Sequence, residues 1–138
     1  MDQRVFKLSI LFSLLFACTL ATANETIADS CFNNSGSYQV IDCFNKKIET
    51  AKIGLDEQRK LLIGKNQKIL HGDNRFIQKE SNIQKKWLLF ANKDCEMRSY
   101  HSGEKGSLIY QMFFSQCMLH RYIERTESLK NSLKLLEV

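Results

Sequence analysis

The stretch "WLLFANKDC", from Trp87 to Cys95, decides how this chain folds. It holds the only tryptophan of the sequence and ends on one of five cysteines. Its apolar first half predicts a helix segment packed in a core, whereas a reactive cysteine at its end would indicate a catalytic thiol. The compartment of Cys95 decides between these interpretations, because thiols form disulfides in oxidising surroundings.

The N-terminus predicts export. Arg4 and Lys7 precede the apolar run "LSILFSLLFA", and Ala21-Thr22-Ala23 offers small residues at its exit. A basic start, a short apolar middle and an A-x-A exit are the features of a secretory signal peptide. We expect residues 1–23 to be removed, which places the mature chain outside the cytoplasm. No transmembrane span is expected, because spanning a bilayer takes about 20 apolar residues.

A second cleavage site is the alternative. "LFAC", from Leu15 to Cys18, resembles the box that precedes a lipid-modified cysteine in bacterial lipoproteins, although Phe16 is bulky for it. Use of this site would give Cys18 a lipid anchor and hold the protein at the envelope. We favour the first site, with Cys18 as a small apolar residue of the signal.

The mature chain is mildly basic. Removal of Asp2, Arg4 and Lys7 with the signal takes Lys+Arg from 20 to 18 and Asp+Glu from 15 to 14, a net charge of 18 − 14 = +4. This charge favours attraction to anionic envelope components, although both signs are scattered along the chain. No nucleic-acid-binding motif is visible, so no nucleic-acid partner is expected.

Four cysteines remain in the mature chain: Cys31, Cys43, Cys95 and Cys117. An even number in an exported chain predicts two disulfides, and four cysteines allow three connectivities. The first two enclose the turn-rich "FNNSGS" and the last two enclose "HSGEKGS", which favours two local bridges. Each bridge would add about 3 kcal/mol to stability by loop closure.

Other roles for the cysteines are weaker. A zinc site could be assembled from Cys95, His101, Cys117 and His120, but their spacing matches no recognised zinc finger. A catalytic thiol has no support, because pairing leaves no cysteine over. The three histidines, His71, His101 and His120, are expected at the surface. No metal or other cofactor is expected.

Helical periodicity predicts an all-α fold. The sequence contains no proline, so long helices are uninterrupted. Residues 24–37 are expected to form an irregular arm, and glycines predict breaks at 64–74 and 101–107. The predicted helices run from Tyr38 to Leu62, from Arg75 to Tyr100 and from Leu108 to Leu136. Short connections between them predict an antiparallel three-helix bundle with two disulfides over residues 38–138.

The second predicted helix has a predicted core face. Its stripe consists of Phe76, Ile83, Trp87, Phe90 and Met97. Cys95 and Cys117 lie roughly 12 and 15 Å from the connecting turn along their helices, so they are nearly level, as a disulfide requires. The opening segment is therefore interpreted as a core helix that ends at a disulfide.

Polar residues predict where two of the helices begin. Ser107 is the expected cap of the third helix, and Asp73 or Asn74 that of the second.

The order of these features resembles a known family. Cys31 and Cys43 precede an amphipathic helix, Trp87 and Cys95 form W-x7-C, and Cys117 and Arg125 form C-x7-R after a glycine turn. The remaining residues of the pattern are Phe90, Gly106, Met112 and Leu129. Over about Ser30 to Leu133 the chain resembles the N-terminal domain of the lysozyme-inhibitor LprI type, found in small secreted or periplasmic bacterial proteins.

The resemblance implies a non-enzymatic, disulfide-bonded envelope protein that blocks a muramidase or another cell-wall hydrolase. Tyr100 and Tyr110, on either side of the glycine turn, are the candidate contacts with such a partner, because tyrosine is enriched where proteins bind one another. The alternative function is binding of an anionic envelope component by the same domain, which salt would weaken.

An enzyme is the third hypothesis and the weakest. Glu124 with Glu127, or Asp94 with Glu96, could supply a carboxylate pair for glycoside chemistry. Such pairs are common on solvated helix surfaces, and neither a nucleophile with its base nor a phosphate-binding loop is visible. No catalytic residue is expected.

Overall fold

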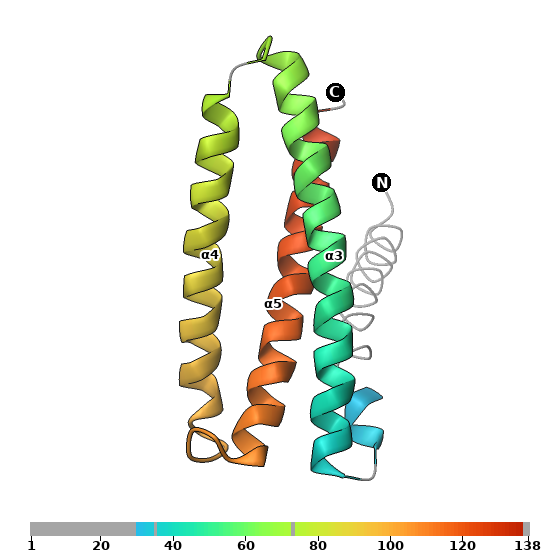
Figure 1. Ribbon diagram of the computed structural model, residues 1–138, viewed down its shortest axis with the longest axis vertical. Coiled ribbons are helices and arrows are strands. Elements are labelled where there is room, and N and C mark those ends of the chain that lie inside the picture. Colours follow the sequence, from blue (N-terminus) through green and yellow to red (C-terminus); the bar gives the residue numbers. More distant parts are fainter. Residues whose placement is uncertain (1–29, 35, 73, 137–138) are drawn as a thin grey trace, which may run out of the picture.

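The computed structural model describes residues 30–34, 36–72 and 74–136. A short 3-10 helix η1, Ser30–Asn33, precedes three long helices: α3, Ser37–Ile69; α4, Arg75–Ser99; and α5, Leu108–Leu135. Successive long helices run in opposite directions (Figure 1), which confirms the all-α antiparallel three-helix bundle. The predicted signal peptide and Cys18 lie outside the described residues, and η1 replaces part of the predicted irregular arm.

Most of the core lies between α3 and α5. Leu119 of α5 is almost wholly buried, and so is Phe44 of α3. Each of these helices supplies five residues to the buried cluster, namely Val40, Phe44, Ile48, Leu55 and Leu62 from α3 and Met118, Leu119, Tyr122, Leu129 and Leu133 from α5. From α4 only Ala91 and Cys95 belong to that cluster. The helix α4 is therefore the least deeply packed of the three.

The helix α3 is longer than predicted. Gly64 was expected to begin a break, yet it lies inside the helix, which continues to Ile69. A glycine in a helix interior costs only about 1 kcal/mol relative to alanine, which is too little to end a helix held by packing. The chain turns instead at His71 and Gly72, which have φ of 51° and 85°. The Gly72 N–H donates to the Gln67 carbonyl at 2.8 Å and so closes the end of α3.

Three of the five residues in the predicted core stripe of α4 lie outside the core, because the buried face is rotated by roughly a quarter turn of the helix. Phe90 is 62% exposed, Met97 61% and Ile83 54%, whereas Ala91 and Cys95 are fully buried. The disulfide fixes which side of α4 meets α5, and the small Ala91 on that side lets the two helices approach closely. Ile83, Phe90 and Met97 consequently face outward, whereas Phe76 and Trp87 pack against the edge of the core.

The two predicted helix starts differ in outcome. Ser107 caps α5 as predicted, because its side-chain oxygen accepts a hydrogen bond from the Tyr110 N–H at 3.2 Å. Asn74 occupies the cap position of α4 but its side chain makes no cap hydrogen bond. Asp73 lies outside the described residues.

Both predicted disulfides are confirmed. Cys31 and Cys43 join η1 to α3 with a Cα–Cα distance of 5.7 Å, and Cys95 and Cys117 join α4 to α5 at 5.6 Å. In Figure 1, η1, the start of α3 and the α4–α5 turn lie at the same end of the bundle. We call residues 30–34, 36–44 and 95–117 the disulfide end. Within the described ranges, no helix contains an apolar stretch long enough to cross a bilayer.

Candidate functional site

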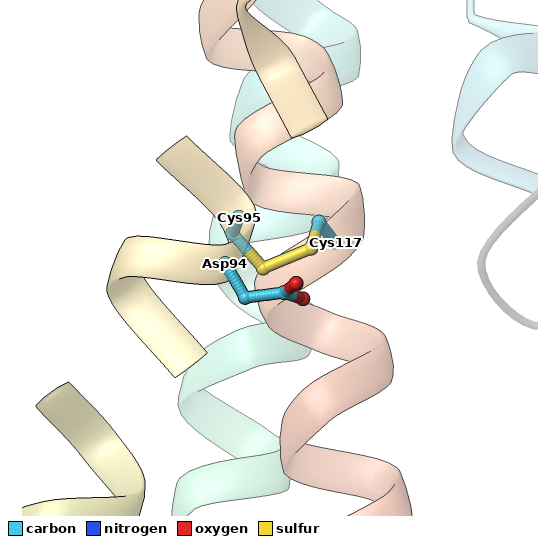
Figure 2. A group of neighbouring side chains, drawn as sticks. All are labelled: Asp94, Cys95 and Cys117. Carbon is cyan, nitrogen blue, oxygen red and sulfur yellow. A yellow bond between two sulfur atoms is a disulfide. The ribbon is translucent and has the colours of Figure 1, made fainter. Parts of the chain in front are cut away.

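The Cys95–Cys117 disulfide lies beside the carboxylate of Asp94 (Figure 2). Among the described residues these three form the group whose ligand atoms lie close enough to hold a metal ion, within 4.8 Å of one another. Their chemistry does not suit zinc, because both sulfur atoms are consumed by the disulfide and are not thiolates. His101 is exposed and does not belong to this group.

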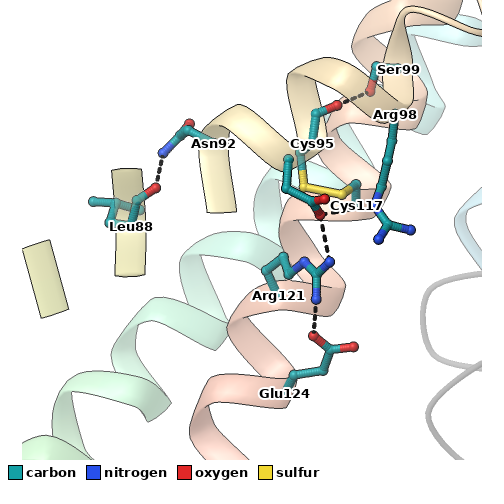
Figure 3. Close-up of a disulfide and its surroundings, with 9 residues drawn as sticks. Leu88, Asn92, Cys95, Arg98, Ser99, Cys117, Arg121 and Glu124 are labelled. Atoms are coloured by element: carbon teal, nitrogen blue, oxygen red, sulfur yellow. Dashed lines mark hydrogen bonds and ion pairs between the residues drawn. A yellow bond between two sulfur atoms is a disulfide. The ribbon is translucent and has the colours of Figure 1, made fainter. Parts of the chain in front are cut away.

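Two arginines hold the Asp94 carboxylate. Arg121 of α5 donates to it, and Arg98 donates to it through Nε at 2.9 Å. Arg121 also donates to Glu124 at 2.8 Å (Figure 3). The hydrogen bond from Arg121 is the main reason why the pKa of Asp94 is lowered from its ordinary value, and Arg98 adds to the effect. This network fastens α4 to α5 next to the disulfide.

The four candidate carboxylates are all held in ion pairs with basic side chains. Glu96 accepts from Lys93 at 3.0 Å and from Lys105 at 3.2 Å, and both hydrogen bonds lower its pKa. The pKa of Asp94 is lowered as well, whereas a general acid for glycoside cleavage needs a raised one. Of the second pair, Glu124 is bonded to Arg121 and Glu127 to Lys130.

A shallow cleft of about 360 Å³ opens beside the disulfide, lined by residues of α4 and α5 that include Arg98, Arg121 and His120. The Nε2 atom of His120 is buried and has no hydrogen-bond partner among the described residues. His71 and His101 are exposed as expected, but His120 is partly buried, which corrects the expectation that all three lie at the surface.

One group of aromatic rings surrounds the α4–α5 turn. The Tyr100 ring meets the Tyr110 ring edge to face at 5.8 Å, and Tyr110 stacks on Phe114 at 6.1 Å. Tyr100 is 59% exposed, but Tyr110 is only 5% exposed. Of the predicted contact pair, Tyr100 is therefore the side chain that is open to a partner, whereas Tyr110 lies beneath it.

A second aromatic group lies where η1 packs on the long helices. Phe32 of η1 meets the buried Phe44 at 5.3 Å and the partly exposed Phe113 of α5 at 6.0 Å. The Cys31–Cys43 disulfide fixes η1 against α3 immediately beside this group. Sequence analysis did not assign Phe32 any role, because nothing in the residue pattern alone places η1 near α5.

The α4–α5 turn is held by its own hydrogen bonds. Gly106 has φ of 96°, a conformation that favours glycine, and its carbonyl accepts from the Gln111 side chain at 2.9 Å. Lys105 reaches back to Glu96 of α4 at 3.2 Å. A β-carbon on Gly103 would lie 2.8 Å from the Ser107 hydroxyl, so a larger residue there would disturb the cap. The turn is thus preorganised, which lowers the entropy cost of binding a partner.

The other residues of the family pattern are distributed between core and surface. Trp87 packs edge to face on Tyr122 at 5.4 Å, and Leu129 is buried. Met112 packs against the core from its edge, as Trp87 does. Phe90 is the exception, because it points away from the core.

Arg125 belongs to a polar cluster that links all three long helices. Burial lowers its pKa, and the nearby Glu80 carboxylate opposes that effect. Glu80 of α4 is itself buried and accepts two hydrogen bonds from Arg59 of α3, at 2.8 and 2.9 Å. Sequence analysis missed Arg59 and Glu80. The one available signal was the helical spacing of Glu80 with Trp87, Ala91 and Cys95.

Comparison with known protein families gives a match. A family model described as lysozyme inhibitor LprI matches residues 29–129, which is most of the chain. No curated protein matches the chain. No solved structure matches it either.

Proposed function

Since this chain belongs to the lysozyme inhibitor LprI family, we propose that it is a non-enzymatic envelope protein that blocks a muramidase or another cell-wall hydrolase. Its two disulfides suit an oxidising compartment, which supports export to the periplasm or the medium. Residues 1–23 are proposed as the signal peptide that takes it there, and residues 38–138 as the inhibitory domain.

The observation that carries this proposal is the exposed aromatic surface of the disulfide end. Tyr100 and Phe113 are partly or largely exposed there, yet each rests on another ring within the same end. Rigid aromatic side chains give large contact area at low entropic cost and dominate the energetics of many interfaces. We therefore place the contact with the hydrolase at this end, with Tyr100 as its main anchor.

The charges of the disulfide end agree with a basic partner. Asp42 is paired with Lys46, and Glu96 is paired with Lys93 and Lys105, so positive and negative groups are balanced locally. Many lysozymes are strongly basic, and a uniformly basic surface would repel them. A locally neutral, aromatic surface avoids this repulsion. Bound over the substrate groove of a muramidase, this surface would keep the glycan away from the enzyme's catalytic carboxylates.

The test is the clearing of a peptidoglycan suspension by lysozymes of several types, with and without the oxidised protein. We expect dose-dependent protection at near-stoichiometric protein for at least one type. Tyr100→Ala should weaken that inhibition at least about tenfold, since an anchor residue of this kind contributes strongly to binding. The matched control is Phe90→Ala, an equally exposed aromatic outside the disulfide end, which should inhibit normally. Absence of protection against every lysozyme type would refute the proposed function.

A further inference from the structure

The outward face of α4 carries apolar side chains that the bundle leaves uncovered. Ile83, Leu89, Phe90 and Met97 are each more than half exposed. Ile83, Phe90 and Met97 follow one another at intervals of seven residues, so they form a row about 21 Å long on one side of the helix. Exposed apolar residues are common singly, but such a row indicates a surface that binds something.

A row of lysines runs beside the apolar row. Lys79, Lys86 and Lys93 have the same seven-residue spacing, and all three are exposed. Within the described residues, Lys79 and Lys86 form no ion pair, whereas Lys93 is paired with Glu96. The outward face of α4 is therefore apolar and cationic along the same length.

We propose that this face docks on an anionic lipid surface, with Ile83, Phe90 and Met97 entering between the headgroups and the lysines lying on the lipid phosphates. Helices that rest on membranes combine these two features, and each lysine near an anionic bilayer adds to the affinity. The helix α4 suits this role because it forms one long side of the bundle (Figure 1). Its full length can therefore lie along a flat surface.

Two other occupants fit the face less well. A second copy of the chain would set lysine row against lysine row, and like charges across an interface are unfavourable. An acidic protein segment would find a single convex helix rather than a groove, whereas helical peptides are usually bound in grooves. Lysine, a compact charge without the fixed fork of arginine, also suits mobile phosphates better than one defined carboxylate.

The outward face of α4 is separate from the disulfide end over most of its length. Docking through it would place the proposed inhibitor at the membrane. A bundle lying on α4 would rest along the membrane, with the disulfide end at one end of the docked helix. The inference does not depend on the identity of the hydrolase, because vesicle binding is measured without one.

The experiment is vesicle flotation with the exported chain, purified from a host that expresses the full sequence. We expect the protein to float with vesicles of phosphatidylglycerol and phosphatidylethanolamine, to be released by salt, and to stay behind with phosphatidylcholine alone. Lys79→Gln/Lys86→Gln should lower the partition coefficient about 25-fold, at about fivefold for each lysine. Phe90→Ser should lower it about tenfold, because the exposed ring loses its insertion into the lipid.

The matched control removes the same two charges from α3. Lys46→Gln/Lys60→Gln alters two lysines that are exposed and paired within their own helix, so it should bind vesicles almost as the parent does. Thermal unfolding of every variant checks the fold. Failure to float with anionic vesicles would overturn the inference and leave an acidic protein as the occupant. The inference would also be overturned if all variants bound vesicles equally. Binding to phosphatidylcholine vesicles, which a lipid on Cys18 would cause, would overturn it too.

Discussion

Asp94 shows how one side chain is given its role by its neighbours. It stands next to Cys95 in the sequence, where a carboxylate beside a cysteine could indicate a metal site. In the fold it receives hydrogen bonds from Arg98 and Arg121, and its pKa falls because those partners favour the charged form. The bond to Arg121 makes Asp94 part of the attachment of α4 to α5.

Asp94→Asn should destabilise the protein in a pH-dependent way. Because the pKa of Asp94 is lower in the folded than in the unfolded state, its stabilising effect is complete above about pH 4. That effect is lost as the pH falls through the folded pKa. At pH 7 the substitution should lower the free energy of unfolding by about 1 to 2 kcal/mol, and this difference should shrink as the pH falls below about 4.

Urea unfolding at a series of pH values measures this difference. Asp42→Asn is the control, because Asp42 pairs with Lys46 in an exposed position and such pairs contribute less than about 1 kcal/mol. A destabilisation of Asp94→Asn that stays constant from pH 7 to pH 2 would show that the charge of Asp94 is not what matters.

Glu80 is the residue least expected from its sequence position. An acid in the buried face of a helix is costly unless its charge is paired, and here Arg59 pairs it with two hydrogen bonds. Arg125, one of the residues of the family pattern, lies close enough to interact with this pair. Its place in the pattern therefore coincides with a buried ion pair that joins α3 to α4.

At the scale of the element, α4 depends on a few strong attachments. Cys95 and Ala91 are its only members of the buried cluster, and Trp87 adds a partly buried contact with Tyr122. Further links to the bundle are Phe76 at the edge of the core, the disulfide to Cys117 and the ion pairs of Asp94 and Glu80. A helix fixed in this way should loosen when its covalent attachment is removed.

Cys95→Ala/Cys117→Ala should lower the free energy of unfolding by about 3 kcal/mol and release α4 selectively. Hydrogen exchange followed by mass spectrometry should show a larger loss of protection in Arg75–Ser99 than in α3 or α5. Cys31→Ala/Cys43→Ala is the matched control, because it removes a disulfide without touching α4. A uniform loss of protection across all three helices would contradict the weak attachment of α4.

The whole molecule presents two surfaces with different chemistry. The disulfide end is aromatic and locally neutral, whereas the outward face of α4 is apolar and basic. A partner protein at Tyr100 and a membrane at Ile83 and Phe90 would contact different residues. Docked on the membrane in this way, the inhibitor would lie where wall hydrolases act.

The two activities should therefore be separable by substitution. Phe90→Ser should lose vesicle binding and keep lysozyme inhibition, whereas Tyr100→Ala should lose inhibition and keep vesicle binding. Protein already bound to anionic vesicles should still protect peptidoglycan, which a clearing assay with added vesicles measures. If either substitution abolished both activities, the two surfaces would not be independent.

The sequence by itself determined the elements and the covalent links. Helical periodicity without proline predicted α4 and α5 to within a residue or two, and cysteine spacing favoured the two local disulfides, because both depend on neighbours along the chain. Gly64 misled the prediction of the end of α3, since the packing of a long helix outweighs one weak residue.

Only the tertiary structure decided which face of each helix is buried. A helix with apolar residues on several sides, as α4 has, can pack in more than one rotation, and sequence periodicity does not choose among them. The disulfide and the small Ala91 made that choice, which turned Phe90 outward. Burial of Tyr110 and pairing of Glu80 with Arg59 likewise depend on residues far along the chain, so no local pattern could reveal them.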